Sequence, residues 1–171
     1  MVRNGAVFDS ERRLFDSGVD IVCRDGRIET VGRDAAAPEG ARVVDAGGMY
    51  VLPGLIDCHV HLASSGAPRA LTESMAEAPH LRALRAAVHA RKTLEAGFTT
   101  VRDLGAPEHL NVHLAKAIDE GVAEGPRIVA AGMGVTMTGG HGHGFIAREA
   151  DGPDDVRKAV REQLRAGAMA I

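Results

Sequence analysis

Tryptophan is absent from this chain of 171 residues, tyrosine occurs once, and only two cysteines are present. Such a small set of large aromatic rings argues against a recognition surface built from them. Cys23 and Cys58 are too few for a disulfide framework. No long hydrophobic region follows the first residues, so we find no secretory signal and expect a cytoplasmic protein with reduced thiols.

Long apolar runs and a dominant charge are missing as well. No run approaches the length of a membrane-spanning helix, and the net charge is only −3. These absences argue against nucleic acid and against a membrane as partners. The chain does have 45% hydrophobic residues, enough for a sizeable core, and 21 glycines, which favour many tight turns. Its class is therefore that of a globular protein.

The first 52 residues have the pattern of short β-strands. Apolar runs at 19–24 and 27–31 flank Asp25-Gly26, a pair that tolerates the positive φ angles of a two-residue hairpin turn. A further strand is expected at 42–46, before two glycines. We therefore predict a small antiparallel sheet over residues 1–52, beside the main domain.

Beyond residue 53 the pattern changes to alternating strands and helices. The sequence predicts helices over 79–96, 108–121 and 154–166, and strands that begin after Gly54, Gly97, Gly125 and Gly167. Such a repeated βα unit implies parallel strands joined by right-handed crossovers. An open doubly wound sheet and a closed barrel both fit this pattern, although a barrel needs eight strands and this chain reaches only the start of a fourth.

Residues 53–62 begin with a Pro-Gly turn signal and continue as a short apolar run, which indicates a buried strand. Residues two apart on a strand point to the same side, so Asp57, His59 and His61 share one face. Cys58 belongs to the other face, where we expect it to pack. Two neighbouring imidazoles can bind one metal ion while a carboxylate orients them. The alternative is two buried histidines that each make a hydrogen bond, and the spacing favours the metal.

A second candidate lies in the glycine-rich loop Thr138–Gly144, which follows the third predicted strand. In a parallel βα architecture, the loops after the strand ends build the active site. His141 and His143 could polarise a carbonyl or bind a carboxylate, and the glycines would let the backbone approach a ligand. The alternative is a flexible turn whose histidines have no role.

The other histidines form weaker patterns. His109 and His113 are four apart on a predicted helix, but the glutamate of a His-Glu-x-x-His zinc motif is missing, so a solvated helix face is favoured. His80 and His89 have no partner at a useful spacing. The chain also lacks a Gly-x-Ser-x-Gly motif, so nothing supports a serine nucleophile.

Three of these stretches resemble a known family. Leu52–His61 is similar to the first barrel strand of the amidohydrolase superfamily of metal-dependent hydrolases. Gly97–Gly105 and Thr138–His143 resemble segments of its imidazolonepropionase-like and Xaa-Pro-dipeptidase-like branch. The resemblance implies an α/β fold. Residues 53–171 would hold about the first three and a half βα units of a (β/α)8 TIM barrel, and residues 1–52 would belong to a small β-sandwich domain.

The resemblance also implies roles for the candidate residues. His59 and His61 would bind a metal, usually zinc. Asp57 would orient these ligands without binding the metal itself. His141 or His143 would bind the substrate. One or two divalent ions are expected in total.

Further ligands come from later strands in this family, namely a lysine that is often carbamylated, histidines and an aspartate. The carbamylated lysine is expected just beyond Ile171. The catalytic residues are therefore expected outside this chain, which would be the amino-terminal part of a longer protein.

The activity implied by the resemblance is hydrolysis of an amide or related C–N bond by a metal-activated water, as in a prolidase-like dipeptidase. The partner would be a dipeptide or another small-molecule substrate, and a homo-oligomer is left open. Two alternatives stand beside this one. The first is hydrolysis of a cyclic amide, as in imidazolonepropionase, and the second is a non-catalytic truncated fragment.

Overall fold

The computed structural model describes the backbone of residues 1–171 and the side chains of residues 1–70 and 72–171. The chain divides into two compact units, Met1–Pro53 and Gly54–Ile171. Among the described residues, no helix is both long and apolar enough to cross a bilayer. The boundary between the units falls within the Pro53-Gly54 turn signal, and the assignment of the two units as domains of a complete protein stays a prediction.

The first unit is built on a five-stranded sheet in which β3, β2, β1 and β4 follow one another and β5 also pairs with β1. Asp25 and Gly26 have φ angles of 50° and 72°, and the strands on either side of them pair antiparallel, which confirms the predicted hairpin. The strands are β1 Val2–Asp9, β2 Leu14–Arg24, β3 Arg27–Gly32, β4 Val44–Asp45 and β5 Tyr50–Val51.

Two short strands of this unit differ from the expected antiparallel sheet. β4 and β5 both run parallel to β1, pairing near Val2 and Ala6 respectively. A parallel pairing requires a crossover connection, and the long segment 33–43 supplies one before β4. The antiparallel prediction is therefore wrong for these two strands. The described residues of this unit form a single sheet, and a two-layer sandwich stays a prediction.

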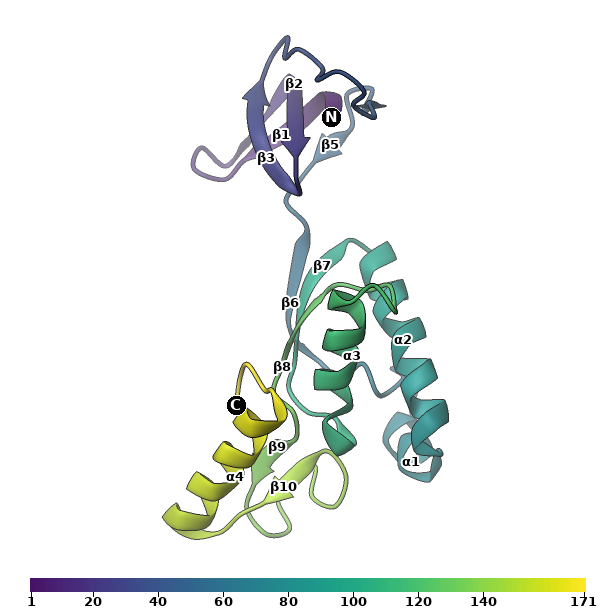
Figure 1. Ribbon diagram of the computed structural model, residues 1–171, viewed down its shortest axis with the longest axis vertical. Coiled ribbons are helices and arrows are strands. Elements are labelled where there is room, and N and C mark those ends of the chain that lie inside the picture. Colours follow the sequence, from purple (N-terminus) through teal and green to yellow (C-terminus); the bar gives the residue numbers. More distant parts are fainter. The chain divides into compact units, whose positions relative to one another are not determined.

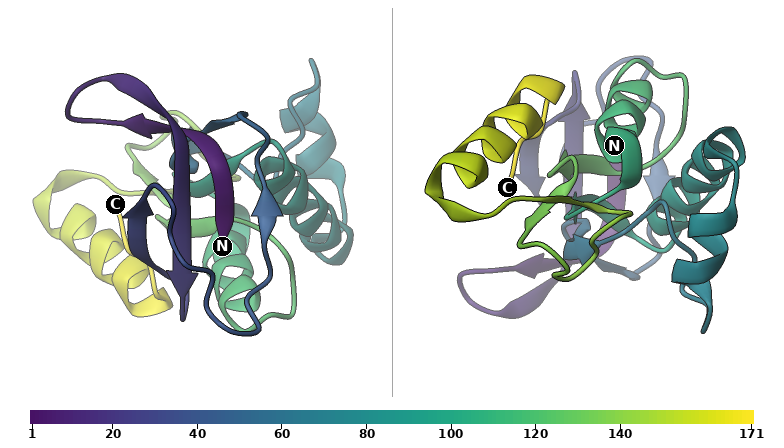
Figure 2. Two further views of the ribbon diagram at one scale, coloured as in Figure 1. Left: turned by 90° about the horizontal axis from the view of Figure 1, so that it is seen from above. Right: turned by 90° about the horizontal axis from the view of Figure 1, so that it is seen from below.

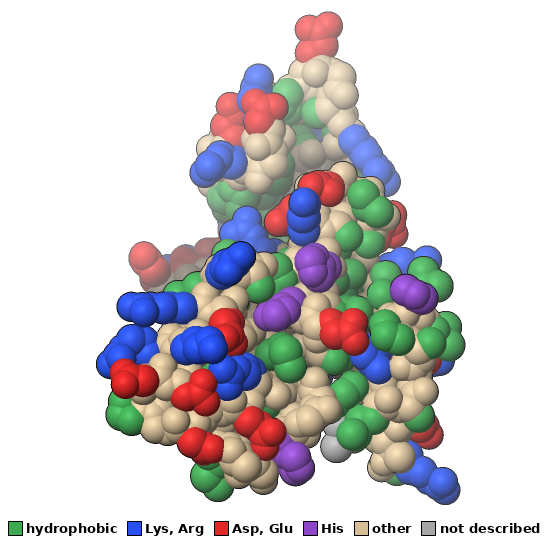
Figure 3. Space-filling view, turned by 60° about the horizontal axis from the view of Figure 1, so that its bottom comes forward, with side chains coloured by type: hydrophobic (Ala, Val, Ile, Leu, Met, Phe, Trp, Pro, Cys, Tyr) green, Lys and Arg blue, Asp and Glu red, His purple; other side chains and the backbone are tan. Residues whose placement is uncertain are grey.

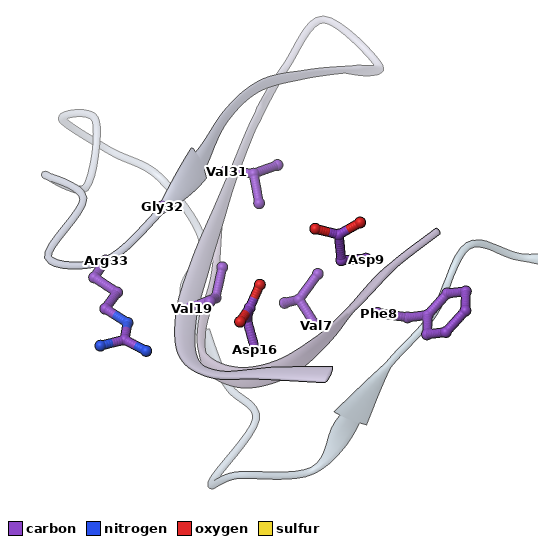
Figure 4. A pocket seen from close by; sticks show the side chains of 8 residues that line it. All are labelled: Val7, Phe8, Asp9, Asp16, Val19, Val31, Gly32 and Arg33. Carbon is purple, nitrogen blue, oxygen red and sulfur yellow. The ribbon is translucent and has the colours of Figure 1, made fainter. Parts of the chain in front are cut away.

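One hollow of the first unit lies on the concave side of its sheet (Figure 4). Val7, Val19 and Val31 point into it, and the carboxylates of Asp9 and Asp16 stand beside them. All the candidate site residues predicted from the sequence belong to the second unit. The lining of the hollow therefore includes none of these candidate residues.

The second unit contains a parallel sheet in the order β6, β7, β8, as the repeated βα pattern predicts. Helices α2, α3 and α4 follow one another across the unit, with α1 near one end of α2 (Figures 1 and 2). The strands are β6 Leu55–Val60, β7 Phe98–Asp103 and β8 Arg127–Ala130, and the helices are α1 Ala70–Ala76, α2 Pro79–Glu95, the 3-10 turn Pro107–His109, α3 Leu110–Asp119 and α4 Gly152–Ala166.

The core of this unit lies between the sheet and helices α2 and α3. Ala86 and Ala90 of α2 are fully buried, as is Val101 of β7. Small side chains on α2 let the helix approach the strands closely. Gly54 has a similar role, because a Cβ there would come within 2.0–2.6 Å of the Thr99 side chain. The Pro-Gly signal thus marks a position where β6 begins against β7 with no room for a side chain.

The third strand is followed by a small pair of parallel strands, β9 Gly134–Thr136 and β10 Ala147–Glu149, which the sequence pattern did not predict. Helix α1 was not predicted either. The predicted fourth strand at 168–171 is absent from the described residues, although the Met169 N–H donates to the Ala130 carbonyl at 2.7 Å. The tail therefore touches the end of β8 without forming a ladder. A closed barrel stays a prediction.

Helix α4 is tied to β10 by one arginine. Arg148 pairs with Asp155 at 2.9 Å and with Glu162 at 3.0 Å. The acidic and basic side chains of this helix mix on the face shown in Figure 3. The hydrogen bond from Arg148 holds the pKa of the Asp155 carboxyl below its ordinary value of 3.8. This cluster fixes the strand that follows the glycine-rich loop.

The Arg148 cluster predicts a pH dependence of stability. Because the folded-state pKa of Asp155 is lowered, the pairing stabilises the folded protein above pH 3.8 and is lost as the pH falls through the lowered pKa. We expect Arg148→Met to be less stable than the wild type at neutral pH and the difference to shrink below pH 3.8. Urea unfolding at several pH values measures the difference in free energy of unfolding between the variant and the wild type. Arg165→Met, on the same helix, is the control, and a difference independent of pH would contradict the prediction.

Candidate metal centre

The paired histidines lie where β6 ends. His59 is on the strand and His61 follows its last residue, and the centres of their rings are 5.3 Å apart. The Asp57 carboxylate accepts the His59 backbone N–H at 3.0 Å, so it braces the backbone between the two. Cys58 is exposed, and the expectation that it packs is wrong. The reason is that β6 is an edge strand of the described sheet, whose outer face is partly uncovered.

One hydrogen bond sets the chemistry of the His61 ring. Its Nδ1 atom lies 2.9 Å from the carbonyl oxygen of Gly105. A carbonyl oxygen only accepts hydrogen bonds, so Nδ1 must carry the proton. In a neutral imidazole, Nε2 then keeps a lone pair, and this division of roles is typical of histidines that bind metals. The Gly105 carbonyl thus leaves His61 Nε2 available as a ligand.

The spacing of the two rings fits one bound ion. Imidazoles that share a zinc ion, with Zn–N distances of about 2.1 Å and a tetrahedral angle, have ring centres roughly 5 Å apart. The observed separation of His59 and His61 is 5.3 Å. Among the described side chains, no group of three or more His, Cys, Asp or Glu residues gathers at one point. The described side chains therefore bring two imidazoles to a spacing that one ion could bridge.

A buried carboxylate holds this arrangement in place. Asp103, at the end of β7, is fully buried, and its Oδ2 accepts the Leu62 N–H at 2.9 Å. Its Oδ1 accepts the Gly105 N–H at 3.2 Å and the Asn111 side-chain amide at 2.9 Å. Burial raises the pKa of Asp103, whereas these donors act in the opposite direction. Asp103 therefore fixes both the residue after His61 and the glycine that orients the His61 ring.

Helices α2 and α3 complete the support. The His89 Nδ1 atom lies 2.9 Å from the Leu62 carbonyl oxygen, so the N–H and the C=O of Leu62 are both held by side chains. Asn111 also donates to the Gly132 carbonyl at 3.0 Å, which connects the network to the loop after β8. The spacing of the histidines in the sequence indicated no partner for His89. The one available signal was its place on the helix that covers β6 and β7, and the contact spans 27 residues.

The glycine-rich loop is anchored by acidic side chains. The Thr138 N–H donates to Asp151 at 3.1 Å, and the Gly139 N–H donates to Glu149 at 2.6 Å. The His143 Nδ1 atom lies 2.7 Å from the Gly140 carbonyl oxygen. By the same argument as for His61, this contact leaves Nε2 of His143 with its lone pair. His141 is exposed. The loop is thus held at its first residues, and the side chains of His141 and His143 are exposed.

The glycine-rich loop and the paired histidines meet around Gly105. A Cβ on Gly105 would lie 3.2 Å from the Ile146 carbonyl oxygen, so the absence of a side chain allows this close approach. The same oxygen accepts the Gly134 N–H at 2.8 Å. Gly105 therefore contacts His61 on one side and the end of the loop that carries His143 on the other. The two candidate groups lie at the same end of the sheet.

The predicted helix face with His109 and His113 is not formed. His109 has a φ of 57° and precedes α3, so it does not share a helical turn with His113. Its ring lies beside Gly132, and its buried Nε2 has no hydrogen-bond partner among the described residues. The interpretation as a solvated helix face is wrong for His109 and holds for the exposed His113.

The sequence profile of the amidohydrolase family matches residues 50–171. The chain belongs to this family. It is 32% identical to the ochratoxinase of Aspergillus niger over 146 residues, covering 71% of this chain and 30% of that protein. It is 46% identical to the dihydroorotase of Geobacter sulfurreducens over 66 residues, covering 39% of this chain and 15% of that protein.

A solved amidohydrolase structure is similar over nearly the whole chain. It is a prolidase in complex with N-methylphosphonate-L-proline, with a TM-score of 0.86 and 34% identity, covering 98% of this chain and 44% of that protein. The resemblance read from the sequence is therefore confirmed at the level of the family and of its prolidase-like structural neighbours. The chain spans less than half the length of these relatives.

The hydrogen bonds of Asp103 predict that even a conservative substitution of this residue lowers the free energy of unfolding strongly. Asp103→Asn replaces one carboxylate oxygen with a donor, so at least one of the three N–H groups that it binds loses its acceptor inside the protein. We expect the free energy of unfolding of the complete protein to fall by about 2 kcal/mol or more, measured by urea denaturation. Asp119→Asn makes the same chemical change at an exposed position of α3 and should cost less than about 0.5 kcal/mol. Equal effects would contradict the prediction.

Proposed function

We propose that the complete protein is a metal-dependent amidohydrolase that hydrolyses an amide or related C–N bond, with a prolidase-like dipeptidase as the best-supported activity. The observation that carries the proposal is the pair His59 and His61, whose ring spacing fits one ion and whose second ring is oriented by Gly105. The similarity to a prolidase with a bound proline derivative supports the choice of a dipeptide substrate. Zinc, a carbamylated lysine and a homo-oligomer stay predictions.

In this proposal the residues of this chain bind the metal ion and orient the histidine rings that hold it. His59 would bind a divalent ion through one of its ring nitrogens, and His61 would bind it through Nε2. When bound, such an ion lowers the pKa of a water molecule and polarises a carbonyl group. Asp57 braces the backbone of His59, while Asp103 and Gly105 keep the His61 ring in one tautomer.

The glycine-rich loop would bind the substrate. The His143 Nδ1 contact with Gly140 holds the ring by its inner edge and leaves Nε2 toward the outside. In its protonated form, this ring or that of His141 can donate a charge-assisted hydrogen bond to a carboxylate. The free carboxylate of a dipeptide is such a group. The loop is anchored by Asp151 and Glu149, so the rings start from a defined position.

Removing either paired imidazole tests the metal site. We expect His59→Ala and His61→Ala to lose bound metal and turnover together, because two ligands from one strand are needed to hold the ion. Elemental mass spectrometry measures the metal content of the purified complete protein. The rate of dipeptide hydrolysis measures its turnover. His80→Ala removes an exposed imidazole from α2 and should change neither. Full metal content and activity in His59→Ala would show the assignment to be wrong.

A substrate panel tests the activity and the loop together. We expect the protein to hydrolyse Xaa-Pro dipeptides faster than cyclic imides. We expect His143→Ala or His141→Ala to raise KM about tenfold for dipeptides with a free carboxylate, since a hydrogen bond to a charged group is worth about 1.5 kcal/mol or more. Carboxamide analogues should show no such increase. Faster hydrolysis of cyclic imides would favour the imidazolonepropionase-like alternative, and no hydrolysis by metal-loaded protein would favour a non-catalytic role.

A further inference from the structure

A cation is buried in the second unit without a carboxylate. Arg82 of α2 is only 5% exposed, and the ion pairs among the described side chains do not include it. Its Nε and Nη2 atoms donate to the Ser74 carbonyl at 3.1 and 2.7 Å, and Nη2 also donates to the Glu77 carbonyl at 2.9 Å. Both carbonyls lie at the C-terminal end of α1, where helix carbonyls lack partners and the helix dipole is negative.

The guanidinium also contacts the glycine-rich loop. Its central carbon lies 5.0 Å from the centre of the Phe145 ring, a distance at which a cation is attracted by an aromatic face. Phe145 is two residues after His143, and its N–H donates to the Gly142 carbonyl at 3.3 Å. His143 and Phe145 therefore belong to one closed turn. A side chain that holds Phe145 also holds the histidine.

The same arginine reaches toward the paired histidines through α1. The Ser74 hydroxyl donates to the Ala63 carbonyl at 3.3 Å, and Ala63 is two residues after His61. The Arg82 guanidinium thus contacts α1, which is bonded to the segment after His61. It also contacts the ring of Phe145, which follows His143. The contacts of Arg82 with Ser74 and Glu77 are local in the sequence, whereas its contact with Phe145 joins distant parts of the chain.

We propose that Arg82 is a positioning residue that sets the place of the His141–His143 loop relative to the His59–His61 pair. Burying a charge without a carboxylate is costly, and an apolar side chain would fill the same space at lower cost. Arginine is suited to this position because its planar fork binds two carbonyls while its face stacks on a ring, which a lysine cannot do. The structural part of the proposal stands on its own contacts, and its kinetic consequence rests on the proposed function.

Variants of the ring test the anchoring without removing the buried charge. Phe145→Leu keeps an apolar side chain but loses the aromatic face, whereas Phe145→Tyr retains it. In the complete protein we expect backbone amides 142–147 to exchange with deuterium roughly tenfold faster in Phe145→Leu and at the wild-type rate in Phe145→Tyr. Arg82→Lys should resemble Phe145→Leu. Arg85→Met removes an exposed, carboxylate-paired cation from the same helix and is the matched control.

Steady-state kinetics, with a dipeptide that the wild type hydrolyses, test the effect of the same variants on substrate binding. We expect Phe145→Leu and Arg82→Lys to raise KM several-fold with metal content unchanged and kcat affected less. A merely structural role would lower the melting temperature without moving KM. Unchanged exchange in the loop, or faster exchange with an unchanged KM, would overturn the inference. If the wild type hydrolyses no dipeptide, the proposed function fails, whereas the exchange experiment still decides whether Arg82 places the loop.

Discussion

The hydrogen bond between the His61 ring and the Gly105 carbonyl is the contact on which the candidate site depends. It fixes the tautomer that leaves Nε2 free for an ion. The N–H of Gly105 is bound by Asp103, and the same carboxylate binds the residue after His61. A fully buried carboxylate that accepts three hydrogen bonds is costly to disturb, because each abandoned donor would stay unsatisfied in the interior. The position of the His61 ring is thus fixed by a network of polar side chains behind it.

The end of the sheet that carries the candidate site is assembled from loops that the strands and helices hold in place. The glycine-rich loop could have been a mobile turn, yet Asp151 and Glu149 bind its first residues and Phe145 contacts a buried guanidinium at its end. Gly105 allows the loop to lie against the support of the paired histidines. The substrate-binding and metal-binding roles proposed for these loops are therefore coupled through backbone contacts. Loops positioned in this way are typical of sites at the C-terminal ends of parallel strands.

Local pattern was sufficient for part of this arrangement. The His-x-His spacing placed two rings on one side of a strand, and alternation of strands and helices predicted the parallel sheet. Contacts across the chain were not predictable in the same way. Asp103 at a strand end could equally have formed an ion pair, and His89 lacked a partner because its contact is 27 residues away. The parallel pairing of β4 and β5 depends on a crossover whose path leaves no periodic signal. The His59, His61, His141 and His143 roles remain proposals.

The tautomer of His61 is the most direct test of the account. Nitrogen-15 NMR of the histidine rings, in complete protein freed of metal and with His61→Ala used for assignment, distinguishes a proton on Nδ1 from one on Nε2. The account predicts that in the neutral ring Nδ1 of His61 carries the proton and Nε2 is bare. A proton on Nε2 with a bare Nδ1 would contradict it, because the Gly105 carbonyl could then receive no hydrogen bond from the ring.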